Sequence, residues 1–322
     1  MAGGDGKRLR PFVSKLLGFE LPKQYVSFTG NRSMLEHTFD RAEQLISPEC
    51  LYTVVAQDHL RHPEVRSQLS GRLLHTVVVQ PINRETGPGL LLPLTHLFGR
   101  YPNSTVAVFP SDHFILQEDI FAAYVQQAFD EVERYPSRIV FLGVEPIEAK
   151  SAYGYILPEN QYMDSESPVK GVKAFVEKPD RRLATQIITL GAWWNTMVMV
   201  FKPEFFLQLV SLIAPNLHRS FQKIARLLKA SEELSAIEKI YREMQPVNLS
   251  KDLLENFDVH ARNQLFAICM KDLFWSDWGS EDRILAAIES LKSMEKFPVG
   301  FQLDCFRSQI SEISDRNLDG SF

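Results

Sequence analysis

Short apolar segments alternate with longer amphipathic segments along this chain of 322 residues. Five apolar runs have the β-branched and aromatic content of buried strands, and they cover 51–56 (LYTVVA), 73–79 (LLHTVVV), 104–109 (STVAVF), 137–144 (SRIVFLGV) and 264–270 (QLFAICM). Helices are predicted at 33–46, 118–135 and 280–294, and Ser33 and Glu36 have the spacing of a capping box. Such alternation predicts an α/β fold, with a Rossmann-like, mixed but mostly parallel sheet and helices on both faces.

The pattern also divides the chain into a long globular part and a short end. Residues 203–256 are largely helical with polar faces, and we expect them to form a helical lid or outer layer. We expect one main domain over residues 1–295 and a short C-terminal tail over residues 296–322. In this architecture, ligands bind beyond the carboxyl ends of the strands.

Composition narrows the classes of partner. The chain is 45% hydrophobic and 23% charged, as soluble globular proteins are, and its net charge of −5 gives no reason to expect nucleic acid. No secretory signal or membrane-crossing run is recognised. The three cysteines, Cys50, Cys269 and Cys305, match no metal spacing and indicate reduced thiols. We therefore expect a cytoplasmic protein with small-molecule partners, for which a homo-oligomer is left open.

The first residues, MAGGDGKRLRPF, combine glycines with cations. Gly3, Gly4 and Gly6 allow the backbone to approach a ligand closely, and successive N–H groups there can bind an anion beside Lys7 and Arg8. The segment lacks the third glycine of a dinucleotide fingerprint and the first glycine of a Walker loop. A surface loop with solvated cations is the alternative interpretation.

The remaining pattern, A-G-G-x-G-x-R-L-x-P, resembles the sugar-1-phosphate nucleotidyltransferases, and the later motifs are most similar to mannose-1-phosphate guanylyltransferases. The motifs occur in the family's order between residue 2 and about residue 285, which implies a nucleotidyltransferase catalytic domain over 1–295. The resemblance implies that Arg8 and the Lys23 of "PKQ" are catalytic residues that contact phosphate, and that Gly3, Gly4, Gly6 and Lys7 bind the nucleotide.

One departure from the family concerns the first strand of the sheet. Members of the family have an apolar strand before the glycine loop, whereas Met1 stands at the last residue of that strand. We therefore expect the sheet to lack its first strand, so that either the true start lies upstream or the chain is impaired.

The segment QPINRETGPG (80–89) resembles the family's E-P-x-x-R-N-T-A-P-A, which lines the nucleotide base. The resemblance implies a nucleotide-binding role for Gln80, Asn83, Arg84, Thr86 and Gly87. Gln80 replaces the usual glutamate, and a glutamine offers guanine one acceptor oxygen in place of a carboxylate. This substitution leaves the identity of the base open.

Two aspartates stand in the metal-binding motifs of the family. Asp112 in FPSDHFI resembles the aspartate of P-[AS]-D-H, and Asp277 in WSDWGS resembles that of W-x-D-x-G-S. The resemblance implies that both are catalytic and bind Mg²⁺, which prefers hard oxygen ligands. Taken singly, each is also typical of a helix cap or turn. We expect His113 to be a hydrogen-bonding neighbour rather than a ligand.

Three later segments, SAYGYILP, FVEKPD and WWNTMVMVF, resemble the sugar-binding motifs of the family. In them, Lys178 is implied to be a catalytic partner of the sugar phosphate, and Met197 stands where glycine is usual, either tightening the pocket or merely packing. The residues implied to bind the sugar are Tyr153, Gly154, Glu177 and Asn195.

Together the motifs imply an enzyme that makes a nucleoside diphosphate sugar and pyrophosphate from a nucleoside triphosphate and a sugar 1-phosphate. GDP-mannose from GTP and mannose 1-phosphate is the favoured case, with Mg²⁺ as cofactor. The alternative is a non-catalytic, nucleotide-sugar-binding regulatory homologue. Retention of Asp112, Lys178 and Asp277 favours the enzyme, while the missing strand and Gln80 favour the alternative.

Overall fold

The computed structural model describes residues 1–159, 168–228 and 233–292. Its strands are β1 Thr53–Ala56, β2 Val77–Gln80, β3 Val106–Val108, β4 Phe114–Ile115, β5 Ile139–Val144, β6 Gly154–Pro158, β7 Val169–Glu177, β8 Trp193–Phe201, β9 Leu265–Met270 and β10 Trp275–Ser276. Its α-helices are α1 Arg10–Leu17, α2 Met34–Glu43, α3 Pro63–Leu69, α4 Thr86–Arg100, α5 Glu118–Arg134, α6 Arg181–Thr189, α7 Pro203–Ile213, α8 Pro215–Leu227, α9 Glu233–Glu243, α10 Glu255–Ala261 and α11 Glu281–Lys292.

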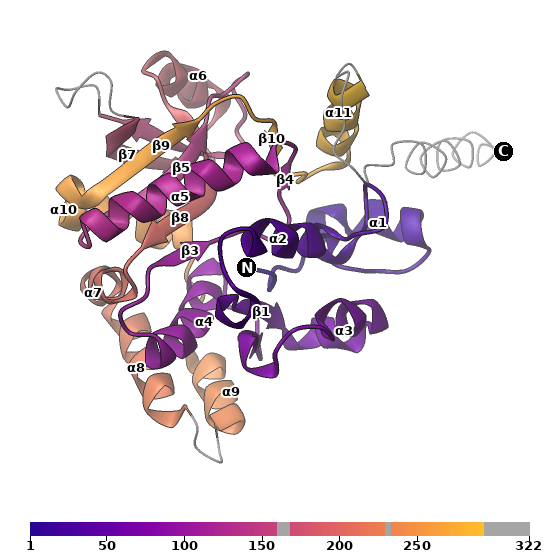
Figure 1. The fold of residues 1–322 in the computed structure, drawn as a ribbon, viewed down its shortest axis with the longest axis vertical. Coiled ribbons are helices and arrows are strands. Elements are labelled where there is room, and N and C mark those ends of the chain that lie inside the picture. Colours follow the sequence, from indigo (N-terminus) through magenta and orange to yellow (C-terminus); the bar gives the residue numbers. More distant parts are fainter. Residues whose placement is uncertain (160–167, 229–232, 293–322) are drawn as a thin grey trace.

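The larger sheet has the strand order β3-β8-β5-β9-β7-β6, and β1 and β2 form a separate parallel pair (Figure 1). β8 runs antiparallel to β3, β5 and β6, and β7 runs antiparallel to β6 and β9. β3, β5, β6 and β9 therefore share one direction, although β5 and β9 are the only parallel neighbours in this sheet as described. The predicted α/β class with a mixed sheet is confirmed, but most of its hydrogen-bonded pairs are antiparallel.

Helices cover both faces of this sheet, as predicted (Figure 1). Alternate side chains of β5 point to opposite faces: Val140 and Leu142 pack with α5 and α6, while Ile139 and Phe141 pack with α4 and α7–α10. The described residues of 203–256 lie mainly in helices, and they bury their apolar side chains in the same core as Ile139 and Phe141. The division into domains stays a prediction, and the predicted tail over 296–322 lies outside the described residues.

A third core lies beneath α1, α2 and α3 and includes Trp278 and Ile284 from the later part of the chain. The Trp278 ring stacks on Phe114, with ring centroids 4.6 Å apart. The predicted capping box at the start of α2 is confirmed, since Glu36 N donates to Ser33 Oγ at 3.2 Å and Ser33 N donates to Glu36 Oε2 at 2.8 Å. This core packs helices from the start of the chain against residues 278–287.

Sequence analysis predicted that the sheet lacks its first strand. Met1 and Ala2 lie at that place, between β1 and β3. Ala2 pairs in parallel with Val55, and its N–H donates to Val54 O at 2.9 Å. The Met1 amino group donates to Phe109 O at 2.9 Å, and Ser111 N donates to Met1 O at 3.3 Å. The expected gap is thus bridged, by two residues only.

Two further expectations concern cysteines and membranes. Cys50 and Cys269 are unpaired and half-buried, and Cys305 lies outside the described residues. Among the helices that the structure describes, none combines the length and the apolar character needed to span a bilayer.

Candidate active site

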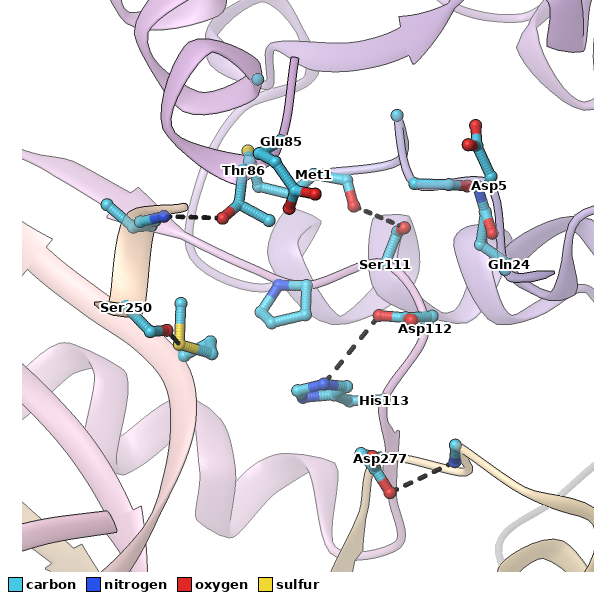
Figure 2. Close-up of a pocket in the computed structure, with 18 of the residues that line it drawn as sticks. Met1, Asp5, Gln24, Glu85, Thr86, Ser111, Asp112, His113, Ser250 and Asp277 are labelled. Atoms are coloured by element: carbon cyan, nitrogen blue, oxygen red, sulfur yellow. Dashed lines mark hydrogen bonds and ion pairs between the residues drawn. The ribbon is translucent and has the colours of Figure 1, made fainter. Parts of the chain in front are cut away.

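A cavity of about 620 Å³ opens beyond the carboxyl ends of β2 and β3, beside β8 and the loop that follows β10. Such a position is where ligands of α/β sheets bind. All predicted site residues except Arg84 and Gly87 border this cavity. Figure 2 shows residues from distant parts of the chain, Asp5, Thr86, Asp112, Ser250 and Asp277, arranged around it. The shared location is a structural finding, whereas the catalytic and binding roles of these residues stay predictions.

Lys23 joins the two predicted metal ligands. Lys23 is buried, with 7% of the residue exposed. Its Nζ lies 2.9 Å from Asp112 Oδ2 and donates to the backbone oxygen of Asp277 at 2.6 Å. Burial by itself would raise the pKa of Asp112, but attraction to Lys23 and His113 outweighs it and holds that pKa below its ordinary value. The Asp112 carboxylate is therefore ionised at neutral pH.

The side chain of Asp277 is held by Arg283, which sequence analysis did not identify. Arg283 Nη1 lies 2.9 Å from Oδ1 and 3.0 Å from Oδ2 of Asp277, and Gly279 N donates to Oδ1 at 3.2 Å. A Cβ at Gly279 would lie 2.6 Å from Asp277 Oδ2, so glycine is needed there. Arg283 also lies over the ring of Tyr153, 5.1 Å from its centroid. The sequence signal that could have identified Arg283 is its place as a basic residue in the first turn of the helix after W-x-D-x-G-S.

His113 lies beside Asp112, with its Nε2 3.9 Å from Asp112 Oδ1 (Figure 2). Its ring is edge-on to the ring of Trp275, with ring centroids 5.2 Å apart. Burial lowers the pKa of His113, so the imidazole is neutral at pH 7. Within the described residues, no group of three or more His, Cys, Asp and Glu side chains is arranged to hold a metal ion. A metal bound here would therefore depend on the two aspartates and on ligand oxygens.

The glycine loop is shaped by two close approaches. Gly6 has a φ of 58°, a conformation that glycine adopts without strain, and the turn leads into α1. A Cβ at Gly3 would lie 2.7 Å from Gln80 Nε2, and Gln80 Nε2 donates to Gly3 O at 3.3 Å. Gln24 Nε2 donates to Gly4 O at 2.9 Å. The loop is thus held in place by two glutamine side chains.

The loop cations and the later Lys178 are more exposed than Lys23. Lys7 forms an exposed ion pair with Asp5 at 3.5 Å, while the exposed Arg8 guanidinium has no partner among the described residues. Lys178 also borders the cavity, and its Nζ lies 2.6 Å from Glu177 Oε1. Arg8 is therefore available to an anionic ligand.

Gln80 is buried at the cavity wall, and its Oε1 has no hydrogen-bond donor in the described part of the chain. Gly89 leaves room for it, since a Cβ there would lie 3.4 Å from this oxygen. An unpaired buried acceptor costs free energy unless a ligand or water pairs with it. This oxygen thus suits a donor on a bound ligand.

Arg84 and Gly87 contact the helical layer instead of lining the cavity. Arg84 Nε and Nη2 donate to the backbone oxygens of Tyr241 and Arg242, both at 2.8 Å. Gly87 N donates to Val247 O at 2.9 Å, and a Cβ at Gly87 would lie only 2.7 Å from that oxygen. Arg84 and Gly87 therefore both contribute to the packing of residues 241–247 against the start of α4.

Sequence analysis missed the cavity wall formed by Asn248, Leu249 and Ser250. This wall is attached to the 80–89 segment, since Leu249 N donates to Thr86 Oγ1 at 2.8 Å across 163 residues (Figure 2). Nothing local in the sequence indicated this contact.

Comparisons with known proteins agree with this geometry. The model of the family described as Nucleotidyl transferase matches residues 1–294. A mannose-1-phosphate guanylyltransferase from Escherichia coli is 25% identical over 291 residues, covering 87% of this chain and 59% of that protein. One from Salmonella muenchen is 27% identical over 287 residues, covering 87% and 57%. The chain thus spans less than three fifths of the length of these curated relatives.

Solved structures show the same fold at lower identity. A mannose-1-phosphate geranyltransferase from Thermus thermophilus superimposes with a TM-score of 0.72 at 22% identity, covering 92% of this chain and 78% of that one. A mannose-6-phosphate isomerase from Helicobacter pylori gives a TM-score of 0.63 at 18% identity, covering 79% and 95%. With a family model matching nearly the whole described length, the chain belongs to the nucleotidyl transferase family.

Proposed function

We propose that this chain transfers a nucleotidyl group from a nucleoside triphosphate to a sugar 1-phosphate and releases pyrophosphate. The observation that carries the proposal is that the glycine loop, Lys23, Asp112, Lys178 and Asp277 border one cavity of about 620 Å³. That volume is in the range of small-molecule sites. The relatives named mannose-1-phosphate guanylyltransferase support GTP and mannose 1-phosphate as substrates and GDP-mannose as product.

In the proposed reaction, a phosphate oxygen of the sugar 1-phosphate attacks the α-phosphorus of the triphosphate. A new P–O bond forms while the bond from the α-phosphorus to the bridging oxygen breaks, and its electron pair leaves with pyrophosphate. Catalysis of this kind consists mainly of positioning and charge stabilisation. The backbone of residues 3–6 and Arg8 would hold the triphosphate, and Lys178 would hold the sugar phosphate.

The cations also reduce repulsion between the two anionic substrates. Two unit charges about 4 Å apart interact by roughly 4 kcal/mol at the effective dielectric constant near a protein surface. Exposed ion pairs contribute only about 0–1 kcal/mol. The buried position of Lys23 is therefore what lets its charge stabilise the bound phosphates.

The donor set at the two aspartates fits Mg²⁺, which takes one or two carboxylates and completes its shell with phosphate oxygens and water. Asp112 Oδ1 accepts no hydrogen bond from the residues that the structure describes, and Asp112 and Asp277 both border the cavity. These two residues would hold the ion, which when bound neutralises charge on phosphate oxygens.

The side chain of Gln80 supports a base that presents an N–H donor. Its Nε2 is committed to Gly3 O, so Oε1 is the atom left to read the base. Guanine offers such donors at N1 and N2, and its pairing with Gln80 Oε1 is the contact that we propose for GTP.

A second candidate function, binding of a nucleotide sugar without catalysis, is favoured by one observation. Both aspartates are already paired with cations, Asp112 with Lys23 and Asp277 with Arg283. A metal ion must compete with these ion pairs, and a site that never binds one would bind ligands without turnover.

Pyrophosphate release tests the two candidates. Purified protein is assayed with GTP, ATP, dTTP or UTP and with mannose 1-phosphate or glucose 1-phosphate, in the presence of Mg²⁺. We expect the fastest turnover with GTP and mannose 1-phosphate, and a loss of at least roughly 100-fold in kcat for Asp112→Asn and Arg8→Ala. Asp58→Asn and Arg61→Ala are matched controls, because these side chains form an exposed pair. Tight binding of GDP-mannose without pyrophosphate release from any pair would establish the binding function instead.

A further inference from the structure

Met197 in β8 combines a strained backbone with a position at the cavity wall. Its φ is 60°, a left-handed conformation that residues with a side chain rarely adopt. The strand is irregular here, since the register between β5 and β8 shifts between Leu142 and Gly143. Such strain persists only where the surroundings hold it, and it is concentrated at functional sites.

The Met197 side chain is held by two polar groups that are nearly buried. Asn195 Nδ2 lies 3.4 Å and Ser250 Oγ 3.3 Å from the Met197 sulfur, and these two residues are only 7% and 8% exposed. Asn195 Oδ1 also accepts the Met197 N–H at 2.9 Å. The dashed line at Ser250 in Figure 2 marks the contact with the sulfur.

A thioether sulfur is a weak acceptor, so these two donors are poorly satisfied in the protein. Both Asn195 and Ser250 border the cavity, as Met197 does. Without the Met197 side chain, the same place would offer an open volume with two donors aimed at it. An oxygen acceptor on a ligand would pair with them better than sulfur does.

We propose that Met197 is a specificity-determining residue that excludes sugar 1-phosphates carrying an N-acetyl group. The methionine fills the volume that an acetamido group would need, and it occupies the two donors that would bind the acetamido carbonyl oxygen. The cavity then accepts compact hexose 1-phosphates with unsubstituted hydroxyls. This inference rests on the proposed function for the identity of the ligand as a sugar 1-phosphate.

Three variants separate the volume of the Met197 side chain from its sulfur acceptor and from the Ser250 donor. Met197→Gly removes the side chain, and glycine accepts a φ of 60° without strain, so this variant is expected to fold. Met197→Leu keeps a similar volume and removes the sulfur acceptor, and it should still exclude the larger sugar. Ser250→Ala combined with Met197→Gly opens the same volume but leaves one donor fewer.

The experiment compares glucose 1-phosphate with N-acetylglucosamine 1-phosphate, which differ only at C2. We expect the ratio of kcat/KM for the N-acetylated sugar over glucose 1-phosphate to rise at least tenfold in Met197→Gly and to stay within twofold of wild type in Met197→Leu. Addition of Ser250→Ala should remove at least half of the gain. An unchanged ratio in a Met197→Gly protein with normal circular dichroism, or an equal rise in Met197→Leu, would overturn the proposal.

Calorimetric titration of each sugar 1-phosphate separates this proposal from the proposed function. If wild type binds sugar 1-phosphates but releases no pyrophosphate, the proposed reaction is wrong, and the same tenfold change is then required of the ratio of Kd values. Mannose 1-phosphate is titrated in parallel. If it binds to wild type while neither of the other two sugars binds to wild type or to Met197→Gly, this proposal alone is wrong. If none of the three sugars binds, both proposals are wrong.

Discussion

Gly87 lies where Val247 packs against the start of α4, and a single added methyl group there should destabilise the protein. A Cβ at this position would lie 2.7 Å from Val247 O and 3.2 Å from Val247 Cγ1. The atom in the way belongs to the backbone, and its oxygen already accepts the Gly87 N–H at 2.9 Å. Relief therefore requires that the two segments move apart and that this hydrogen bond lengthens.

The cost can be estimated from these contacts. Overpacking of a closely packed site costs about 1–3 kcal/mol, and weakening one backbone hydrogen bond costs about 1 kcal/mol. Alanine is favoured over glycine inside a helix by about 1 kcal/mol, which acts in the opposite direction. We expect Gly87→Ala to lower the free energy of unfolding by about 1–3 kcal/mol in total.

Gly99→Ala in the same helix is the matched control. A Cβ at Gly99 would meet only Leu228 Cδ1, at an ordinary 3.8 Å, so this variant should gain about 0.5–1 kcal/mol from helix propensity alone. Urea unfolding followed by circular dichroism measures the difference, which corresponds to roughly 1 M in midpoint for an m-value of about 3 kcal/mol/M. If Gly87→Ala unfolds at the same urea concentration as Gly99→Ala, the steric reasoning is wrong.

Three further predictions concern the site, the helical layer and pH. Arg283→Gln should lower kcat by about 10- to 100-fold in the pyrophosphate assay, because the Asp277 carboxylate loses the cation that holds it. Arg283→Lys should recover part of the rate, and equal rates in wild type and both variants would contradict this reasoning. Arg84→Gln should reduce the free energy of unfolding by about 1–2 kcal/mol while leaving the KM for the nucleotide within twofold, because its hydrogen bonds go to α9 carbonyls; a large rise in KM would restore a nucleotide-binding role. Burial holds the pKa of His59 below its ordinary value of 6.5 in the folded protein. As the pH falls below 6.5, the unfolded chain therefore takes up a proton at His59 before the folded protein does, and the free energy of unfolding falls. Between pH 7 and pH 5, this free energy should fall less in His59→Gln than in wild type.

The elements that could be predicted from the sequence are those with a local cause. The capping box at Ser33 and Glu36, the apolar period of α5 and the buried strand β5 depend on residues that are neighbours in sequence. The run 73–79 was predicted as one strand, but residues 74–76 form a 3₁₀ turn, and β2 begins at Val77. The antiparallel place of β8 among its neighbours depends on pairing between distant strands, which the pattern of one strand does not contain.

The candidate site divides in the same way. Asp112 and the glycine loop could be placed because loops after parallel strands meet at one edge of a sheet. Arg283 and Ser250 could not, because their roles come from contacts made only after α11 and residues 245–250 have packed. Arg84 does not border the cavity, because its guanidinium donates to a backbone oxygen near the end of a helix 157 residues later in the chain, a contact that its motif could not indicate.

The long sequence separations across the cavity set the order in which the protein can become functional during synthesis. Thr86 and Leu249 are 163 residues apart, and Lys23 and the backbone oxygen of Asp277 are 254 apart. A growing chain therefore emerges from the ribosome with its glycine loop long before either of these contacts can form. Nascent chains arrested before residue 277 lack the backbone oxygen that Lys23 contacts, so ligand capture should begin only after this residue has left the ribosome.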